Sequence, residues 1–393
     1  MRLALFTDSN IFYADGVGRI VRELMAYIRG RPTHSLIVFH KSDGADQAEK
    51  FSENITVCGI AVPYIHVPTY DAYPFFYLSN PQKRLLRIVG DFQPDIILTI
   101  TPYIPFGIGR STLYVAKKLG VPLVGSFDVQ MTAVSQYYAL RILRLRWALK
   151  LWLWYVSLLM ASYEKCARIL VPSRFVLEHV QDRYKRAKCV MFPRAVNGEM
   201  FSPIYRNKSF KVQHGIGGKT VILYTGRLAL EKSLETLMDT YAGLKAQYDD
   251  IALVLVGDGP ERKRLERRGL ADLVLTGVLE GERLSQAYAS ADIFAFPSTV
   301  DAGPVVILEA MASGLPVVVF DQGGAQDAVI HGETGFVAKD VVDFTGCLDK
   351  LIRDTQLRSA IGANARKYAE SQQWDRIFDQ LIVAFNEVIG ESN

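Results

Sequence analysis

Two carboxylates stand eight residues apart in the stretch DAGPVVILEA, as Asp301 and Glu309. A Gly-Pro pair and a run of aliphatic residues lie between them. Proline suits the first turn of a helix, where its missing N–H costs nothing. We therefore expect Asp301 in a loop and Glu309 about one turn into a helix. The two could form an acid–base pair, or accept hydrogen bonds from hydroxyls of a sugar and a ribose. A helix cap or a surface ion pair would be the purely structural explanation.

Two cations flank a second helix start, in GRLALEKSLETL at residues 226–237. Arg227 lies in the turn after a strand-like run, and Lys232 lies where the helix should begin. The free N–H groups of a helix N-terminus also favour an anion. This order of strand, arginine turn and lysine suits a diphosphate. Solvated side chains at a helix start would look the same in the sequence.

Glycine-containing turns follow other strand-like runs as well. Asp15-Gly16-Val17-Gly18 comes after the first run, and Gly257-Asp258-Gly259-Pro260 comes after a later one. Glycine lets a phosphate or a sugar approach the backbone, because it has no side chain to obstruct it. The first turn is not GxGxxG, so we do not expect a nicotinamide dinucleotide.

The elements that must position these residues alternate along the whole chain. Alternation of strand-like and helix-like runs predicts an α/β fold with parallel sheets covered by helices on both faces. It occurs twice, on either side of a loop-like stretch at residues 194–218. Ligands bind outside the carboxyl ends of such strands, so we expect a cleft between two doubly wound domains. The expected strands are Leu3–Thr7, Leu36–His40, Ile96–Thr101, Leu123–Ser126, Ile169–Val171, Thr220–Tyr224, Ala252–Val256, Leu273–Thr276, Ile293–Phe296 and Val317–Phe320, and the expected helices include Gly18–Arg29, Gly109–Leu119 and Ser371–Val388.

The composition agrees with this architecture. At about 100–200 residues per domain, a chain of 393 residues suggests two domains. Hydrophobic residues make up 49% and charged residues 22%, which favours a large core over disorder. A net charge of +4 is too small to indicate nucleic acid. The four cysteines are far apart, so we expect no zinc site. The start MRLALFTDSN is unlike a signal peptide, and we expect a cytoplasmic protein.

One segment, residues 139–163, is unusually apolar and basic. Its uncharged part, Leu151 to Tyr163, is shorter than the roughly 20 residues that span a bilayer. Several basic residues precede it, and Trp152 and Trp154 lie within it. This pattern suits a helix lying on anionic lipid. A domain helix covered on both sides and a surface for a partner protein are the alternatives.

Together these motifs resemble glycosyltransferase family 4, whose members are retaining enzymes of the GT-B fold. The subgroup that this chain most resembles contains bacterial enzymes that transfer mannose, glucose or related sugars to lipid acceptors. The resemblance covers most of the chain and is densest from about residue 220 to 337. The matching residues are Asp15-Gly16-Val17, Gly226-Arg227-Leu228, Glu231-Lys232, Val256 to Pro260, Ala289-Ser290-Ala291-Asp292, Asp301 to Pro316, Gly323-Gly324 and Gly332 to Gly335.

The resemblance implies two Rossmann-like domains facing across a cleft, as the GT-B fold requires. Residues 1–197 would form the acceptor domain and residues 198–370 the nucleotide-sugar domain. Residues 371–393 would form a helix that returns to the first domain.

The resemblance also implies roles for single residues. Arg227 and Lys232 would bind the donor diphosphate, Glu309 the ribose and Asp301 the donor sugar. Family members need no metal or cofactor, and no protein base is required because a donor phosphate oxygen takes the acceptor proton. Further donor-side positions would be Gly16, Gly226, Gly257, Asp258, Gly303, Pro304, Val305 and Val306, and acceptor or membrane positions would be Arg19, Tyr137, Trp152 and Trp154.

Three departures from the family pattern concern the sugar. The family usually has Glu at Asp301 and Phe-Gly at Gly303-Pro304. Asp128 stands where the family has a His that reaches the donor sugar. An aspartate there donates no hydrogen bond unless it is protonated. It could accept one from a hydroxyl or pair with a cationic group on an unusual sugar, so we count Asp128 among the catalytic candidates.

The predicted function is transfer of a sugar from a UDP- or GDP-linked donor to a lipid or glycan acceptor. The location would be cytoplasmic, with peripheral contact to the inner face of the cytoplasmic membrane. Two alternatives remain, a catalytically weak partner subunit and a non-hydrolysing nucleotide-sugar epimerase. For an active enzyme, we expect Arg227→Ala to reduce turnover far more than it disturbs folding.

Overall fold

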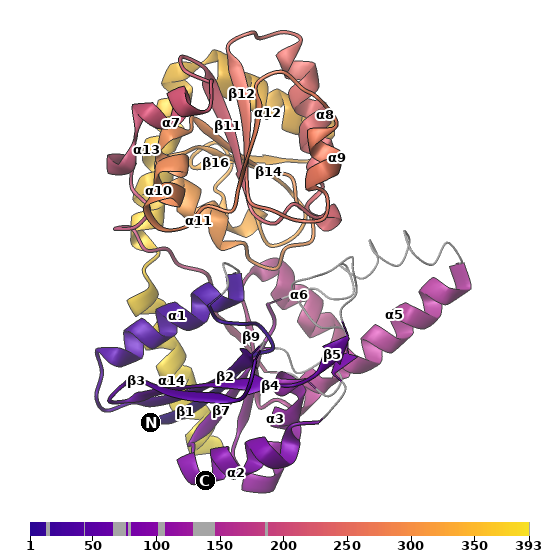
Figure 1. Ribbon diagram of the computed structural model, residues 1–393, viewed down its shortest axis with the longest axis vertical. Coiled ribbons are helices and arrows are strands. Elements are labelled where there is room, and N and C mark those ends of the chain that lie inside the picture. Colours follow the sequence, from indigo (N-terminus) through magenta and orange to yellow (C-terminus); the bar gives the residue numbers. More distant parts are fainter. Residues whose placement is uncertain are drawn as a thin grey trace. The chain divides into compact units, whose positions relative to one another are not determined.

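The computed structural model describes residues 1–12, 16–42, 44–65, 76–77, 80–100, 107–128, 146–184 and 188–392. The chain forms two compact units (Figure 1). Unit 1 comprises Met1–Pro193 and Asp375–Asn393, and unit 2 comprises Arg194–Trp374. Each unit has its own sheet, mostly parallel in unit 1 and all parallel in unit 2, and each unit is described by itself.

The sheet of unit 1 has the strand order β10-β9-β8-β7-β1-β2-β4-β3. Neighbouring strands are parallel except β3, which runs antiparallel to β4 at the edge. Residues of β1 after the first are buried, as expected for a central parallel strand with helices on both faces. The strands are β1 (Arg2–Phe6), β2 (Ser35–Ser42), β3 (Gln47–Ser52), β4 (Ile55–Ala61), β7 (Ile96–Thr99), β8 (Leu123–Ser126), β9 (Arg168–Val171) and β10 (Cys189–Met191), with β5 (Tyr64–Ile65) and β6 (Phe76–Tyr77) in a separate pair.

Helices cover this sheet, and the last of them comes from the far end of the chain. The described helices are α1 (Gly16–Arg29), α2 (Gln82–Phe92), α3 (Ile108–Leu119), α5 (Arg146–Met160), η1 (Ala161–Lys165), α6 (Arg174–Arg183) and α14 (Trp374–Ser392). On α14, Phe378 packs against Tyr27 of α1 and Phe192, with ring centroids 5.2 and 6.2 Å apart. Tyr27 also donates a hydrogen bond to Asp379 (2.5 Å). The C-terminal helix is therefore part of the core of unit 1.

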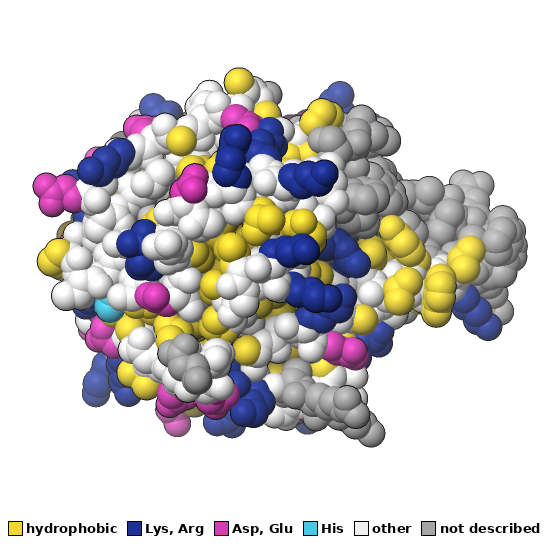
Figure 2. Space-filling model, turned by 90° about the horizontal axis from the view of Figure 1, so that it is seen from below, with side chains coloured by type: hydrophobic (Ala, Val, Ile, Leu, Met, Phe, Trp, Pro, Cys, Tyr) yellow, Lys and Arg dark blue, Asp and Glu magenta, His cyan; other side chains and the backbone are white. Residues whose placement is uncertain are grey.

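Helix α5 leaves one apolar face uncovered. Val156 and Met160 are buried, whereas Leu151, Trp154 and Leu158 are 58%, 62% and 56% exposed. The exposed three are spaced three and four residues apart, so they lie along one face of the helix. Of the three alternatives for this segment, a helix covered on both sides does not describe this face. Seen from below, the molecule shows basic side chains gathered beside apolar ones (Figure 2). No helix in the described part of the chain is long and apolar enough to cross a bilayer.

Unit 2 has an all-parallel sheet with the order β13-β12-β11-β14-β15-β16. Its central strands are continuous apolar runs, and helices lie on both faces (Figure 1). The strands are β11 (Thr220–Thr225), β12 (Ile251–Val256), β13 (Leu273–Gly277), β14 (Ile293–Phe296), β15 (Val317–Phe320) and β16 (Gly335–Ala338). The helices are η2 (Pro203–Tyr205), α7 (Lys208–Gln213), η3 (Leu230–Lys232), α8 (Leu234–Lys245), α9 (Arg262–Glu266), α10 (Gly281–Ser290), α11 (Val305–Ala312), η4 (Gln326–Ala328), α12 (Val341–Arg353) and α13 (Thr355–Ser371).

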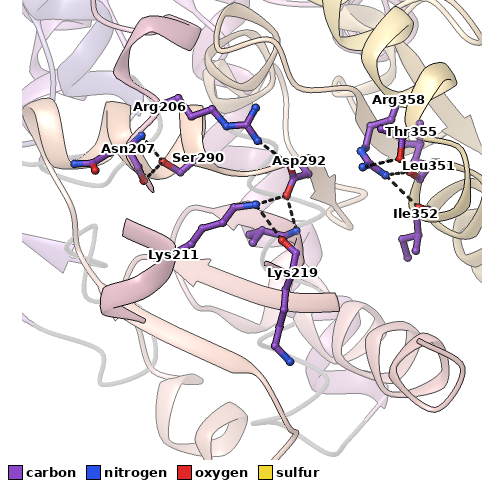
Figure 3. A network of polar contacts seen from close by, with 11 residues as sticks. Arg206, Asn207, Lys211, Lys219, Ser290, Asp292, Leu351, Ile352, Thr355 and Arg358 are labelled. Carbon is purple, nitrogen blue, oxygen red and sulfur yellow. Dashed lines mark hydrogen bonds and ion pairs between the residues drawn. The ribbon is translucent and has the colours of Figure 1, made fainter. Parts of the chain in front are cut away.

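A polar network connects the elements at the amino ends of the central strands of this sheet (Figure 3). Asp292 precedes β14 and accepts hydrogen bonds from Lys211 (2.6 Å), Arg206 (3.1 Å) and the backbone N–H of Val221 (2.8 Å). The hydroxyl of Ser290 accepts from the backbone N–H of Asn207 (3.1 Å). The Ala289-to-Asp292 motif therefore joins α7 to the amino ends of β11 and β14. This is the edge of the sheet opposite the predicted ligand edge.

All ten strands expected from the sequence are present, with ends shifted by at most two residues. Expected helices at 18–29 and 109–119 correspond to α1 and α3. The expected start of the last helix at Ser371 is wrong. Ser371 is the end of α13, and α14 begins at Trp374.

Candidate active site

The candidate site of unit 2 lies where its strand order reverses. The chain runs from β11 through β12 to β13 on one side, then returns to place β14 on the other side of β11. Loops after the two central strands diverge at such a switch point, and ligands bind there. Gly226 and Arg227 follow β11, while Asp301 and the start of α11 follow β14.

The glycines after β11 and β12 allow two turns to pack against each other. The backbone N–H of Gly226 donates to Val256 (3.0 Å), and that of Leu228 donates to Asp258 (2.9 Å). A Cβ on Gly257 would lie 2.0 Å from the carbonyl oxygen of Gly226. Gly257 also has φ of 136°, which favours glycine. The packing of the two turns, which positions Arg227, therefore requires glycine at position 257 irrespective of any ligand.

Each of the two cations is held by a carboxylate. Arg227 Nη2 pairs with Oε1 of Glu231, whose side chain is only 3% exposed. Lys232 Nζ pairs with Asp301 Oδ1 at 2.6 Å, and both side chains are about one fifth exposed. The first pair lies within the loop after β11, and the second joins this loop to the loop after β14 across the switch point. Two fixed cations at this edge can stabilise an anion that gains negative charge.

The loop that carries Asp301 rests on a glycine turn. The backbone N–H of Gly324 donates to the carbonyl oxygen of Asp301 (2.6 Å). Gly323 has φ of 76°, and a Cβ there would lie 2.8 Å from the carbonyl oxygen of Thr299. The Gly323-Gly324 motif thus sets the backbone of Asp301. Atom Oδ2 of the Asp301 side chain is buried and has no hydrogen-bond partner within the described residues.

Burial keeps one phenol of this site neutral. Desolvation, and then the nearby charges of Asp301 and Glu231, raise the pKa of Tyr224 well above its ordinary value. The neutral hydroxyl donates a hydrogen bond to the carbonyl oxygen of Arg227 (3.1 Å). Tyr224 therefore helps to fix the backbone from which the arginine side chain extends.

Glu309 is the fifth residue of α11 and is 2% exposed. Its Oε2 accepts a hydrogen bond from Tyr288 (2.8 Å), and Tyr288 in turn contacts the hydroxyl of Thr225. Pro304 stands just before α11 in an extended conformation, as its N-cap residue. The first N–H groups of a helix have no acceptor within it, so those of Val305 and Val306 are suited to an anion or a polar oxygen. Because Glu309 and Asp301 have different partners, the acid–base pair has no support in these contacts.

The predicted residues of unit 1 follow two parallel strands of its sheet, β1 and β8, which are separated by β7. Gly16 begins α1, after β1, and is exposed, with Arg19 half-buried in the same helix. Asp128 is partly exposed and follows β8. Since β8, β7 and β1 are parallel neighbours, these residues lie at the same edge of the sheet. Tyr137 and the side chain of Trp152 lie outside the described residues.

The structure adds residues to which the sequence assigned no role. Fully buried Asp8 accepts hydrogen bonds from the backbone N–H groups of Ile108 (2.7 Å) and Gly109 (3.0 Å), and so binds the start of α3. Glu231 and Tyr288 support Arg227 and Glu309. In the sequence, only the position of Glu231 beside Lys232 in a matched motif could have indicated that Glu231 belongs to the site.

Comparisons with known proteins match both halves of the chain. Residues 14–199 match the model for Glycosyltransferase Family 4, and residues 206–368 match the model for Glycosyl transferases group 1. A GDP-mannose-dependent alpha-mannosyltransferase of Corynebacterium glutamicum is 29% identical over 397 residues, which cover 100% of this chain and 90% of that protein. Sulfoquinovosyl transferase SQD2 of Arabidopsis thaliana is 30% identical over 387 residues, which cover 95% and 71%.

Solved structures show the same fold over nearly the whole chain. A sucrose-phosphate synthase from Thermosynechococcus elongatus has a TM-score of 0.77 at 18% identity, covering 99% of both chains. The Anabaena protein HepE, in complex with UDP and glucose, has a TM-score of 0.72 at 19% identity, covering 98% of this chain and 100% of that one.

Proposed function

The chain belongs to the glycosyltransferases, because both halves match glycosyltransferase families and relatives of that activity match nearly its full length, and from this we propose a retaining hexosyltransferase. Its two units have the GT-B fold. The proposed reaction moves a sugar from a UDP- or GDP-linked donor to a hydroxyl of a lipid or glycan acceptor.

The observation that carries this proposal is the cluster at the switch point of unit 2. Sugar transfer breaks the bond between the anomeric carbon and the donor phosphate, and the leaving diphosphate gains negative charge. Arg227, Lys232 and the N-terminus of α11 supply positive potential at that edge, which favours the transition state over the ground state. Glu309 would hold the ribose, and Asp301 would face the sugar.

Retention of the anomeric configuration depends on which group takes the proton of the acceptor hydroxyl. Asp301 and Glu231 are each paired with a cation, and a carboxylate in an ion pair is a weak base. This supports a route in which a donor phosphate oxygen takes the proton of the acceptor hydroxyl. The new C–O bond then forms on the face from which the diphosphate departs, and the anomeric configuration is kept.

A transfer assay with the full chain tests the proposal. GDP-mannose is the first donor to try, because several similar relatives are named for it, and UDP-glucose is the second. We expect nucleotide release that depends on vesicles containing diacylglycerol and phosphatidylinositol, and an α-linked product by NMR. A β-linked product would contradict retention. Isomerised donor without release would favour an epimerase, and donor binding without turnover a partner subunit.

The membrane contact is a separate part of the proposal, and α5 supports it. Leu151, Trp154 and Leu158 form an exposed apolar ridge, and exposed Lys150 adjoins it. In the sequence, Arg141, Arg144 and Arg146 precede the ridge. An apolar ridge with basic residues suits the surface of an anionic membrane. The protein would thus meet its lipid acceptor at the inner face of the cytoplasmic membrane.

Changing the ridge should release the protein from lipid. Trp154→Glu with Leu158→Glu is expected to lower binding to anionic liposomes by at least about tenfold in a flotation assay, because two exposed apolar side chains that would enter the lipid are replaced by anionic ones. Val383→Glu is the matched control, since Val383 is an apolar residue of α14 in the same unit and is 58% exposed. Equal flotation of the ridge variant and the control would exclude α5 as the anchor.

A further inference from the structure

We propose that Tyr288 is a positioning residue, which aims the carboxylate of Glu309 at the donor ribose through a chain of hydroxyls that begins at Thr225. The inference rests on the proposed ribose role of Glu309. Tyr288 itself does not contact the substrate in this arrangement. Its effect on the donor passes through one hydrogen bond to Oε2 of Glu309.

The direction of the hydrogen bonds follows from the chemistry of the three groups. An ionised carboxylate only accepts, so the single hydrogen of the Tyr288 hydroxyl goes to Glu309, at 2.8 Å. The Tyr288 oxygen can then accept from the hydroxyl of Thr225. All three residues are at most 3% exposed, so water does not substitute easily for a lost partner.

The ring of Tyr288 is held in place by its neighbours. Phe201 meets it edge-on at 5.4 Å between centroids, and Phe294 lies 5.8 Å away. Such contacts restrict the ring, so the hydroxyl has a fixed position. The hydroxyl can therefore help to define the orientation of the Glu309 carboxylate about its last bond.

The chain of hydroxyls from Thr225 to Glu309 links two parts of the proposed donor site. Thr225 is the last residue of β11, directly before Gly226 and Arg227. Through Tyr288, the ribose-facing carboxylate is tied to the strand that carries the diphosphate-facing arginine. A nucleotide whose ribose and diphosphate match this fixed spacing would bind without reorganisation of either group.

The test compares nucleotides with and without ribose hydroxyls. Affinities of the full chain for GDP and UDP, and for their 2′,3′-dideoxy forms, are measured by calorimetry. We expect Tyr288→Phe to weaken binding of the ribose forms about tenfold and to leave the dideoxy forms unchanged. In turnover, KM for the donor should rise while kcat changes little. Thr225→Val should act in the same direction with a smaller effect, and serves as a second variant should Tyr288→Phe fold poorly.

Tyr241→Phe is the matched control. Tyr241 is fully buried in the same unit, and its hydroxyl donates to the carbonyl oxygen of Ala271 (2.8 Å), away from the switch point. This variant should leave the preference for ribose forms as in the wild type. Equal weakening of ribose and dideoxy forms by Tyr288→Phe would mean a merely structural role and would overturn the inference.

Glu309→Ala separates the two possible failures, because alanine has no side-chain group that can hydrogen-bond the ribose. If Glu309→Ala abolishes the preference for ribose forms but Tyr288→Phe keeps it, the inference is wrong and the ribose role stands. If Glu309→Ala keeps the preference, the proposed ribose role itself is wrong.

Discussion

Lys232→Ala is expected to lower kcat for sugar transfer by about 10²–10³-fold, which is the usual effect of removing one group that stabilises a developing anion. The lysine lies at the switch point of unit 2, and its ammonium is 2.6 Å from Asp301. Its removal leaves Asp301 without a cation, but that side chain is one fifth exposed and can be hydrated. The loss should therefore appear in turnover, measured as nucleotide release with saturating donor, and only slightly in thermal unfolding.

Lys219→Ala provides a close control for this variant. Lys219 also pairs with an aspartate, Asp272, at 2.6 Å, and both side chains are 23% exposed. It precedes β11, at the edge of the sheet opposite the candidate site. Asp272 keeps a second cation in this variant, Lys245 at 2.8 Å, so the control should lose no more stability than Lys232→Ala and should keep its turnover. Similar turnover of the two variants would remove Lys232 from the catalytic assignment.

Arg227→Ala is expected to reduce both activity and stability. The sequence predicted a far larger effect on turnover than on folding, but the arginine is an ion-pair partner of Glu231, whose side chain is 3% exposed. Leaving a buried carboxylate without its cation costs about 3–5 kcal/mol of unfolding free energy. Chemical denaturation of the full chain measures this cost, and the transfer assay measures an expected loss of at least about 10²-fold.

The double variant Arg227→Ala with Glu231→Gln separates the two effects. Glutamine has nearly the shape of glutamate without its charge, so most of the lost stability should return. Turnover should remain low, because the diphosphate still lacks its arginine. Recovery of turnover together with stability would mean that Arg227 serves the fold and not the leaving group.

The fold was readable from the sequence where strands are buried on both faces. Central strands such as Ile293–Phe296 are uninterrupted apolar runs, and all ten strands expected from such runs are present. Of the strands that the sequence did not predict, β4 (ITVCGIA) has this signal, since it is a largely buried strand between β2 and β3, whereas β3 and β10 lack it. Strand β3, with the sequence QAEKFS, is an exposed edge strand, and β10 has only three residues.

The sequence could predict those residues of the site that directly follow a strand. Arg227 and Asp301 follow strands of one parallel sheet, so the sequence could place them at one edge. Their partners were not readable, because tertiary packing decides them. Tyr288 and Glu309 are 21 residues apart on different helices, and no periodic pattern relates them. Asp8 and the α3 N-terminus that it binds are 100 residues apart.

The C-terminal helix has a consequence for biosynthesis. Helix α14 contributes Phe378, Leu381 and Phe385 to the core of unit 1, whereas unit 2 is one continuous segment, Arg194–Trp374. A nascent chain on the ribosome therefore holds every residue of unit 2 before it holds all of unit 1. The half that is translated first must keep an incomplete core until the residues of α14 emerge, and in that interval the apolar surface that α14 later covers is exposed to aggregation.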